Sequence, residues 1–456
     1  MIIRLAATTA ILIALASGAL QTSSEVASGT AAPTAPAAPG VVIVRLTPRA
    51  AGLSDAMLAQ RLRGQIEARL LGLDSLRLRL TPPETPAEAV KRLNRSPYVE
   101  FAEPDLLLRA AMIPNDPFFT AQGAYLNLIE ASLAWDIEQG SESVVVAVLD
   151  SGIDLDHPDL KGKVWSNPRE IENNGIDDDN DGCIDDFYGC SFVTANGSDP
   201  SCAAPGQNLI KDDHGHGTFV SGIIAAQGNN GLGVIGTAPG VRVMPVKILD
   251  CTGGGTASQA ALGLLYAARL GARVANVSFG AEGESLTLVN AMREAHDKYG
   301  MVIVAPTGNS GRRGVSFPAR LRETIAVASS GTALDPLARS SFSDWGAEVR
   351  VAAPGLNVVS TVPMEHCSAW RCAEGQPYAI ASGTSFAAPI VSGLAALLIS
   401  RTPNLSPDAV ARIISSTAQP LPDGDTPNWD GAGRIRMRVA LSQPRYFLGA
   451  AGVSRE

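Results

Sequence analysis

Short apolar runs alternate with longer, helically spaced apolar segments over most of the chain, from residue 115 to about residue 441. The short runs predict β-strands, and apolar residues that recur every three or four positions predict helices. Regular alternation of the two predicts an α/β fold with a doubly wound, mainly parallel sheet. The predicted strands are 144–149, 243–249, 274–279, 301–305, 324–328 and 349–353, and the predicted helices are 218–226, 256–270, 284–299, 385–399 and 407–416.

The stretch 41–110 has a different pattern, which predicts a small α+β domain. A strand is predicted at 41–46, a helix with arginines on its polar face at 58–71, a second helix that ends near 92–97, and a strand at 98–104. The stretch holds 11 Lys and Arg against 8 Asp and Glu, whereas residues 111–456 hold 24 against 36. The net charges of +3 and −12 favour association between the two parts.

The amino-terminal end of the chain predicts export. Residues 1–19 have the features of a secretory signal peptide, with Arg4, a short apolar run and small residues at 17–19. Residues 20–40, rich in Ala, Ser, Thr and Pro, predict a disordered linker, and residues 442–456 predict a short tail. The apolar runs at 5–15 and 386–399 are shorter than a membrane span, so we expect a secreted protein, extracellular or periplasmic, without a membrane anchor.

Composition and cysteine content agree with an exported globular protein. The net charge of −9 offers no general affinity for nucleic acid. Six cysteines allow up to three disulfides in 15 connectivities. Cys367 and Cys372 are close enough to close a small loop, and a local bridge is expected among Cys183, Cys190 and Cys202. The alternative is that several thiols stay free.

Three separated residues predict nucleophilic catalysis. Asp150 ends an apolar run, His216 stands in Gly-His-Gly-Thr, and Ser385 follows Gly383 and Thr384 at the start of an apolar helix. A serine needs a base to remove its proton, and histidine is that base near neutral pH when a carboxylate orients it. Each residue alone has a simpler interpretation, such as a turn residue, one of a metal-binding pair with His214, or a helix cap.

The segments V-V-V-A-V-L-D-S-G-I-D, H-G-H-G-T and S-G-T-S-F-A-A-P resemble the subtilisin-like serine proteases. The resemblance implies a serine endopeptidase with Asn309 as an oxyanion donor beside the backbone N–H of Ser385. It also implies that Ser278, Phe279 and Gly280 pair with an extended substrate. The remaining pocket residues that it implies are Gly308 and Ser316.

Substrate preference follows from the pocket floor that the resemblance assigns to Ser316. A small neutral floor argues against Lys or Arg before the cleaved bond, because those side chains would require a carboxylate, and favours apolar or aromatic residues. The chain departs from the family at Phe219, where a second histidine is usual, and at Pro306 and Thr307, where small residues are usual. These departures bear on the shape of the pocket.

The pattern P-Y-V-E-F-A-E-P-D at 97–105 resembles the end of a subtilase propeptide. It implies that residues 41–111 form an inhibitory propeptide, cut between about residues 106 and 112, ahead of a peptidase domain at 112–441. The chain would then be made as an inactive precursor that its own propeptide inhibits. The alternative is a permanent accessory domain.

An acidic loop predicts a structural calcium ion. Asp177, Asp179 and Asp181 alternate before a glycine, as in the D-x-D-x-D-G start of a calcium loop, and Asp185 or the carbonyl of Cys183 could add oxygens. Tyr188 stands where an EF-hand has its last glutamate, so the loop is not a full EF-hand. The alternative is a solvated acidic turn.

Three functions compete at this stage. The first is a secreted serine endopeptidase that acts on proteins or peptides as a monomer without an organic cofactor. The second is a catalytically silent peptide-binding protein on the same fold. The third, an ester or lipid hydrolase, would require a G-x-S-x-G elbow and the order Ser, Asp, His, and the chain has neither feature.

Overall fold

The computed structural model describes residues 37–106, 112–193, 202, 209–331, 334–373, 375–422 and 426–443. The chain divides into two compact units, Met1–Leu107 and Leu108–Glu456, and each is described by itself. The predicted signal peptide, most of the predicted linker and all of the 442–456 tail except Ser442 and Gln443 lie outside the described residues.

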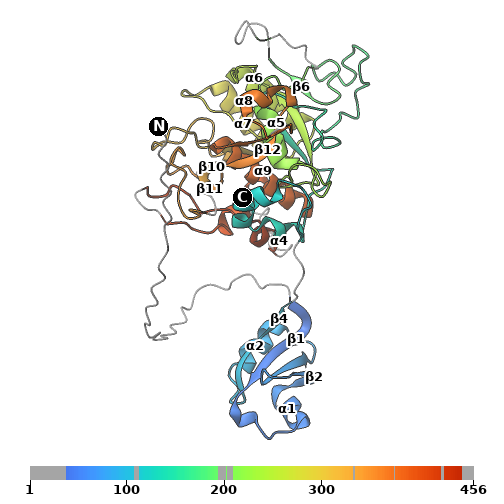
Figure 1. Ribbon diagram of the computed structural model, residues 1–456, viewed down its shortest axis with the longest axis vertical. Coiled ribbons are helices and arrows are strands. Elements are labelled where there is room, and N and C mark those ends of the chain that lie inside the picture. Colours follow the sequence, from blue (N-terminus) through green and yellow to red (C-terminus); the bar gives the residue numbers. More distant parts are fainter. Residues whose placement is uncertain are drawn as a thin grey trace, which may run out of the picture. The chain divides into compact units, whose positions relative to one another are not determined.

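The first unit, blue in Figure 1, is a four-stranded antiparallel sheet with two helices. The strand order is β2-β3-β1-β4, and Leu58, Leu62, Leu76, Leu78 and Leu93 lie fully buried in its core. Its elements are β1 (Ala37–Leu46), η1 (Pro48–Ala50), α1 (Asp55–Leu62), β2 (Gly64–Leu70), β3 (Ser75–Leu80), α2 (Pro86–Leu93) and β4 (Val99–Leu106).

Two expectations for this unit are wrong. The helix predicted at 58–71 ends at Leu62, because Arg63 adopts a left-handed conformation and Gly64 starts β2. A β-carbon at Gly64 would lie 2.6 Å from the carbonyl oxygen of Arg79, so the neighbouring strand β3 holds this segment extended. The predicted disordered linker also ends too late, since β1 begins at Ala37 and pairs there with Leu106 of β4.

The second unit contains a seven-stranded sheet in the order β11-β10-β9-β8-β5-β7-β6, with all neighbours parallel. A two-stranded antiparallel ribbon lies apart from it and leads into α9. The strands of the large sheet are β5 (Val145–Asp150), β6 (Cys190–Ser191), β7 (Arg242–Lys247), β8 (Val274–Asn276), β9 (Val302–Pro306), β10 (Thr324–Ser330) and β11 (Val351–Pro354), and the ribbon consists of β12 (Val358–Thr361) and β13 (Tyr378–Ala381).

Helices cover both faces of the large sheet, as the alternating pattern predicts (Figure 1). Alternate residues of β5 show this arrangement: Val146 and Val148 pack in one cluster with α5 and α9, whereas Val145 and Ala147 pack in another with α6 and α7. The helices are α3 (Phe119–Leu126), η2 (Asn127–Ile129), α4 (Ala131–Trp135), α5 (His216–Ala225), α6 (Ala257–Arg269), α7 (Leu286–Asp297), η3 (Met364–His366), α8 (Cys367–Trp370), α9 (Thr384–Arg401), α10 (Pro407–Ser416) and α11 (Met437–Leu441).

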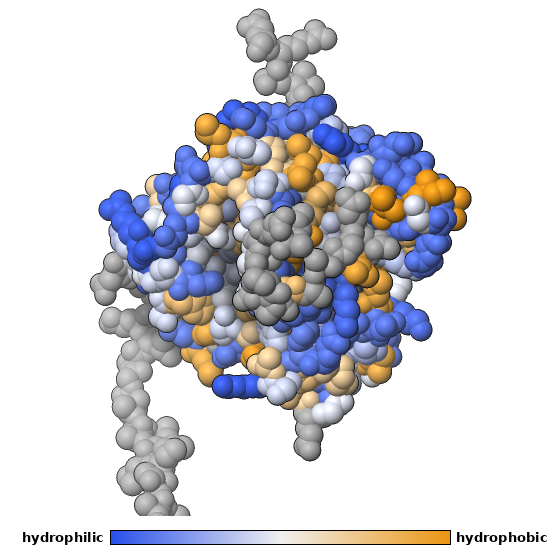
Figure 2. Space-filling view, turned by 90° about the horizontal axis from the view of Figure 1, so that it is seen from above, coloured by the Kyte–Doolittle hydropathy of each residue, from blue (hydrophilic) through white to orange (hydrophobic). Residues whose placement is uncertain are grey.

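The apolar helix α9 is central to the core. It is long and apolar enough to cross a membrane by composition, but 83% of its most apolar window is buried inside the protein. It is therefore the buried core helix that the sequence predicts. On the outside, Figure 2 shows apolar surface in separate patches between hydrophilic residues.

All six cysteines form disulfides, which link Cys183 to Cys190, Cys202 to Cys251 and Cys367 to Cys372. The two short bridges are the kind that the spacing predicts. The third bridge spans 49 residues of sequence, and the spacing gave no sign of it.

The sheet has a topological switch beside its middle strand. From β5 the chain builds one half of the sheet through β7 and β6, and the other half through β8, β9, β10 and β11. In doubly wound sheets, ligands bind at the carboxyl ends of the strands at such a switch point. Asp150 ends β5, and Ser278 lies two residues beyond the end of β8.

Candidate active site

Asp150 and His216 form a hydrogen-bonded pair at the switch point. Nδ1 of His216, the first residue of α5, lies 2.8 Å and 2.9 Å from the two carboxylate oxygens of Asp150. The carboxylate is fully buried, whereas the imidazole keeps 17% of its surface exposed. Because a carboxylate only accepts, Nδ1 is the donor, and Nε2 is left to accept a proton.

Gly217 allows this pairing, because α5 begins directly against the turn that follows β5. A β-carbon at Gly217 would lie 2.1 Å from the carbonyl oxygen of Gly152 and 3.2 Å from the Cβ of Asp150. Only glycine fits this space. Ser151 also ties the turn to the helix, since its hydroxyl accepts from the backbone N–H of Gly217 at 2.9 Å.

A buried carboxylate, Asp212, organises the loop that leads into α5. It accepts hydrogen bonds from the N–H of Gly215 at 2.7 Å, the N–H of Thr218 at 2.8 Å and the hydroxyl of Ser151 at 2.8 Å. Burial opposes its negative charge, but these bonds outweigh burial and lower the pKa of Asp212. Asp212 therefore stays charged and adds a second negative charge near His216.

Two opposing effects act on the imidazole of His216. Burial disfavours its charged form, but the neighbouring carboxylate of Asp150 outweighs burial, and the pKa of His216 is raised above its usual value. The site therefore stabilises an imidazolium, which is the form that a general base takes after it has accepted a proton.

Ser385 is the second residue of α9, so its backbone N–H has no partner four residues earlier inside the helix. Pro389 shapes its surroundings, because a proline has no N–H to bond the carbonyl four residues earlier, here that of Ser385. This carbonyl accepts instead from the hydroxyl of Ser278 at 3.0 Å, and the hydroxyl of Ser385 donates to the carbonyl of Ser278 at 3.5 Å. The ring of Phe386, the next residue, lies 5.5 Å from the imidazole of His216, which places Ser385 and His216 in one site.

Asn309 lies three residues beyond β9 and faces the start of α9. Its side-chain oxygen accepts from the backbone N–H of Thr384 at 2.9 Å and from the Thr384 hydroxyl at 3.0 Å. Because the oxygen is held by Thr384, the amide nitrogen is left to donate to a ligand. That nitrogen lies 3.8 Å from the β-carbon position of Gly383, two residues before Ser385.

Two cavities open beside these residues, and Ser278, Phe279 and Gly280 line both of them. The first, of about 680 Å³, is bounded by His214 and His216 and by residues 252–257. The second, of about 470 Å³, reaches Asn309 and Ser385. The stretch 278–280 therefore forms a wall shared by both halves of a cleft.

The second cavity is lined by small neutral residues and by charged ones, and the buried carboxylate of Asp344 lies beside Gly308. The β-carbon position of Gly308 lies 2.5 Å from the hydroxyl oxygen of Ser316, and that of Gly280 lies 3.6 Å from the Cβ of Ser316. The three predicted pocket residues are thus brought together. Charged residues that the sequence analysis did not single out also line this cavity: Glu282, Arg312, Arg313 and Arg320.

Residues 141–433 match the subtilase family, and residues 23–105 match the fervidolysin N-terminal prodomain. The chain belongs to the subtilase family. It is thus a serine-type peptide hydrolase. Its peptidase region is preceded in the chain by a region similar to a subtilase prodomain. The family establishes the reaction class that the geometry of Asp150, His216 and Ser385 suggests.

Two curated relatives illustrate the similarity. A thermophilic serine proteinase from Bacillus sp. (strain AK1) is 39% identical over 316 residues, which cover 69% of this chain and 67% of that protein. Thermitase from Thermoactinomyces vulgaris is 36% identical over 328 residues, which cover 72% of this chain and 99% of that protein.

Two solved structures share the fold. A protease from Pseudoalteromonas arctica, 28% identical, aligns with a TM-score of 0.57 over 73% of this chain and 99% of that one. Fervidolysin from Fervidobacterium pennivorans, 24% identical, aligns with a TM-score of 0.56 over 90% of this chain and 61% of that one. At that identity the second comparison supports the fold alone.

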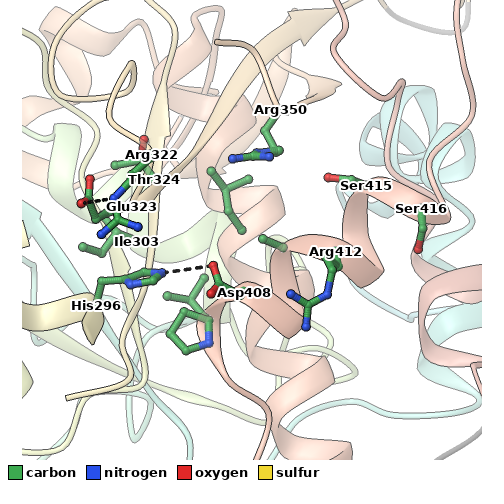
Figure 3. Close-up of a pocket in the computed structure, with 14 residues that line it drawn as sticks. His296, Ile303, Arg322, Glu323, Thr324, Arg350, Asp408, Arg412, Ser415 and Ser416 are labelled. Atoms are coloured by element: carbon green, nitrogen blue, oxygen red, sulfur yellow. Dashed lines mark ion pairs between the residues drawn. The ribbon is translucent and has the colours of Figure 1, made fainter. Parts of the chain in front are cut away.

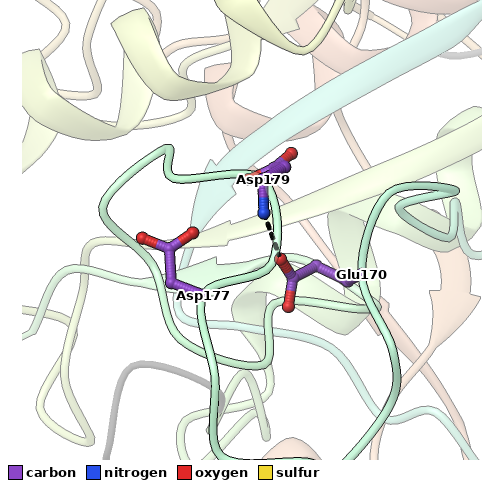
Figure 4. A group of neighbouring side chains, drawn as sticks. All are labelled: Glu170, Asp177 and Asp179. Carbon is purple, nitrogen blue, oxygen red and sulfur yellow. Dashed lines mark hydrogen bonds between the residues drawn. The ribbon is translucent and has the colours of Figure 1, made fainter.

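The acidic loop of this subtilase brings Asp177 and Asp179 together with Glu170, which the sequence analysis missed (Figure 4). One carboxylate oxygen of each of these three residues lies within 4.8 Å of the others. The backbone N–H of Asp179 donates to Glu170 at 3.2 Å. Asp185 lies elsewhere in the loop, where its carboxylate accepts from the N–H groups of Asn174 and Gly175.

Several carboxylate oxygens in this loop are buried without a hydrogen-bond partner among the described residues: Oε2 of Glu170, Oδ1 of Asp179 and Oδ2 of Asp181. Burial, and then the charges of Asp186, Asp179 and Asp177, raises the pKa of Asp181 to about 7. Buried oxygens that lack donors are the chemistry that a hard cation satisfies. The loop therefore fits a calcium ion.

A second group of buried carboxylates lies near the 229–234 loop of this subtilase. Asp116 and Asp159 are both buried, and each accepts a backbone N–H from the 229–234 loop, from Asn229 at 2.9 Å and from Val234 at 2.8 Å. Oδ1 of Asp116 is buried without a partner among the described residues. The sequence analysis missed this pair because the two residues are 43 positions apart and match no linear motif.

A further cavity, of about 800 Å³, lies away from the catalytic residues (Figure 3). It opens at the amino-terminal ends of β9 and β10, and two ion pairs join residues that line it. Arg322 contacts Glu323 at 2.9 Å, and His296 contacts Asp408 at 3.7 Å. Since reactive groups in parallel sheets gather at the carboxyl ends of strands, this cavity is not the catalytic site.

Proposed function

We propose that this subtilase is a secreted endopeptidase, made as a self-processed precursor, with Ser385 as its nucleophile. His216 is the general base, and Asp150 orients the imidazole. The observation that carries the proposal is the Asp150–His216 pair at the topological switch, 2.8 Å apart, beside Ser385 at the start of α9.

The reaction follows from the protonation states. Nε2 of His216 takes the hydroxyl proton as Oγ of Ser385 attacks the carbonyl carbon of the substrate, which forms a tetrahedral intermediate. The imidazolium, stabilised by Asp150, then gives the proton to the leaving amine, and an acyl-enzyme on Ser385 remains. Water, deprotonated by His216, attacks the ester and releases the acid, which restores the serine.

Asn309 and the backbone N–H of Ser385 are the donors for the negative charge that develops on the substrate oxygen. Donors held in place before the reaction stabilise the transition state without a reorganisation cost. Thr384 supplies that constraint, because its two hydrogen bonds hold the amide oxygen of Asn309.

The 278–280 stretch is proposed to bind an extended substrate by strand addition. The residue before the cleaved bond would enter the cavity of about 470 Å³ that Ser316, Gly280 and Gly308 line. The small, neutral side chain of Ser316 favours apolar or aromatic side chains over Lys and Arg. A cleavage profile dominated by Arg in that position would contradict this assignment.

The first unit is proposed to be an intramolecular inhibitor that is removed on maturation. It has its own hydrophobic core, and its sequence matches a subtilase prodomain. The proposed cut lies between residues 106 and 112. A signal peptide at residues 1–19 is proposed to be removed separately.

The proposed location is outside the cytoplasm, because three disulfides suit an oxidising extracellular or periplasmic compartment. We also propose a monomer, since on the face that Figure 2 shows the apolar surface is divided into separate patches.

Calcium is the ion proposed for the acidic loop, with Glu170, Asp177 and Asp179 as ligands and Asp181 adjacent. The unpartnered buried oxygens of Glu170, Asp179 and Asp181, and the closeness of Glu170, Asp177 and Asp179, support the assignment. When bound, the ion would neutralise the mutual repulsion of the carboxylates and stabilise the loop. No step of peptide hydrolysis depends on it.

The test compares the intact mass of the purified chain with that of Ser385→Ala. We expect the wild type to mature between residues 106 and 112 and the variant to keep its propeptide, because Ser385 is needed for the cut. A serine-directed fluorophosphonate should label the mature wild type once and leave the variant unlabelled.

Other results have distinct meanings. If both proteins are trimmed alike, a different protease performs the maturation, and labelling alone decides whether Ser385 is active. If the wild type is neither trimmed nor labelled, the first unit is a permanent domain and the peptide-binding alternative replaces the endopeptidase.

A further inference from the structure

A short disulfide-closed loop packs against the segment that carries the catalytic histidine. This loop, residues 364–372, contains η3 and α8 and is closed by the bridge between Cys367 and Cys372. The backbone N–H of Cys372 also donates to the carbonyl of Cys367 at 3.0 Å. The two half-cystines and Trp370 pack against the main core, so the loop is anchored despite its position at the surface.

Three polar contacts join this loop to residues 211–214, which lead into α5. Glu365 accepts from the ammonium of Lys211 at 3.0 Å, and Nε2 of His366 lies 3.3 Å from the carbonyl oxygen of Asp212. The indole N–H of Trp370 donates to the carbonyl of His214 at 3.0 Å. Two of these contacts reach backbone carbonyls, so the loop holds the backbone on the amino-terminal side of His216 at Asp212 and at His214.

The indole of Trp370 also occupies the space beside the residue that precedes His216. A β-carbon at Gly215 would lie 2.5 Å from the indole nitrogen, and Gly215 has a φ of +97°, so a side chain there is excluded on both counts. The Trp370 ring stacks on Phe219, with centroids 5.2 Å apart and planes inclined by 23°.

From Phe219 the aromatic contacts continue to the reacting groups. The Phe219 ring lies 4.6 Å from that of Phe386, which lies 5.5 Å from the imidazole of His216. Phe386 follows Ser385 directly in α9. Trp370 thus contacts the His216 segment through its hydrogen bond to the His214 carbonyl, and it is linked to the Ser385 segment through the ring contacts of Phe219 with Phe386.

We propose that Trp370, held by the Cys367–Cys372 bridge, is a positioning residue for His216 and Ser385. Its indole N–H fixes the carbonyl of His214, and its ring supports Phe219, which in turn contacts Phe386 beside the imidazole. The inference rests on the proposed roles of His216 and Ser385 and adds a group that acts through them without contacting substrate.

The test measures kcat and KM of the mature enzyme for a peptide substrate in three variants. Trp370→Ala removes the ring and the donor, Trp370→Phe removes the donor but keeps a ring, and Ser368→Ala changes an exposed residue of the same loop. We expect kcat to fall about tenfold in Trp370→Ala and less in Trp370→Phe, with KM changed less than about twofold, because small displacements of catalytic groups are costly. Ser368→Ala should match the wild type.

A pH profile separates positioning from general stability. The titratable groups that face His216 are the carboxylates of Asp150 and Asp212, which raise its pKa, and the imidazole of His214, whose ring centroid lies 6.3 Å away and whose own pKa is lowered by burial. If Trp370 positions the imidazole against Asp150, the acid limb of kcat/KM moves to lower pH in Trp370→Ala. The proposal would be overturned if Trp370→Ala lost activity only in proportion to a lower unfolding temperature, while the acid limb of its kcat/KM profile stayed at the wild-type pH.

The disulfide provides a second test if Trp370→Ala does not fold. Replacing Cys367 and Cys372 together by serine should lower kcat in the same direction, whereas Ser368→Ala should again leave kcat unchanged. Equal kcat in the Cys367/Cys372 variant, Trp370→Phe and wild type would reject the proposal. Fluorophosphonate labelling of Ser385 in the wild type fails only if the proposed catalytic function is itself wrong.

Discussion

At the scale of single residues, the site depends on side chains whose second polar atom is already bound. Nδ1 of His216 is held by Asp150, and the amide oxygen of Asn309 is held by Thr384. Nε2 of His216 is thereby left to face the proposed nucleophile, and the amide nitrogen of Asn309 is left to face the substrate. Fixing one end of a side chain in this way orients the other end before substrate arrives.

Asn309→Ala is expected to lower kcat by about 10²–10³-fold, the loss known for removal of one such donor in subtilisin. KM should change little, because the hydrogen bond forms mainly in the transition state. Steady-state kinetics of the mature enzyme provide the measurement. Thr384→Val, which removes only the hydroxyl that holds Asn309, should show a smaller loss of kcat. A wild-type kcat in Asn309→Ala would exclude this residue from the oxyanion site.

The pH dependence of activity follows from the raised pKa of His216. Below that pKa the imidazole is protonated and cannot accept the proton of Ser385, so kcat/KM falls as pH decreases. The midpoint of the fall is expected above the ordinary histidine value of about 6.5, because Asp150 stabilises the imidazolium. Initial rates between pH 5 and pH 9 at constant ionic strength test this. A midpoint at or below pH 6 would contradict the electrostatic account.

At the scale of elements, glycine and proline decide how segments approach. Gly217 lets α5 start against the turn after β5, and Pro389 releases the carbonyl of Ser385 from its helix so that Ser278 can bond it. The acidic loop is held by backbone N–H groups that donate to its carboxylates, and only some of its oxygens are satisfied in this way. Its remaining buried oxygens are available to a cation.

Removal of calcium is expected to lower the unfolding temperature by several degrees, since an ion bound only by the folded state stabilises that state. Asp179→Asn should lower the unfolding temperature of the untreated protein and abolish the response to chelator. Glu172→Gln, which changes an exposed acid of the same loop, is the matched control and should behave like the wild type. Thermal unfolding with and without EDTA, followed by added calcium, makes the comparison. If EDTA leaves the unfolding temperature of the wild type unchanged, the proposal of a calcium ion in the acidic loop is wrong.

At the scale of the whole molecule, two units of opposite charge share one chain. The stretch 41–110 carries +3 and residues 111–456 carry −12. Much of the positive charge is already used inside the first unit, where Arg77 pairs with Asp105 at 2.7 Å and Arg92 with Glu84 at 2.7 Å. Charge should therefore assist association between the units without being its main source.

Salt is expected to relieve inhibition by the propeptide only in part. In freshly processed protein, activity should rise modestly between about 0.05 M and 0.5 M NaCl, because salt screens attraction between exposed charges. Enzyme separated from its propeptide should not respond. Rates on a neutral peptide substrate provide the measurement, and an equal response of both samples would show that the salt acts on catalysis itself.

The sequence alone determined the class of fold and predicted which residues react. Alternating apolar runs and helical spacing predict the parallel sheet because strands buried on both faces must be apolar throughout. The motifs around Asp150, His216 and Ser385 predict the catalytic set because their chemistry requires those residue types. Local pattern failed at 58–71, where pairing with β3 overrode helical spacing.

The tertiary structure decided which distant residues meet. Strand order brings β5 beside β8 and so creates the switch point, and neither strand carries a local sign of that pairing. The same holds for Glu170 in the acidic loop, for the bridge from Cys202 to Cys251, and for Trp370 against the His216 segment. The physical reason is that a residue's type and its near neighbours set its chemistry and local conformation, whereas contacts across the fold depend on how all the buried surfaces pack at once.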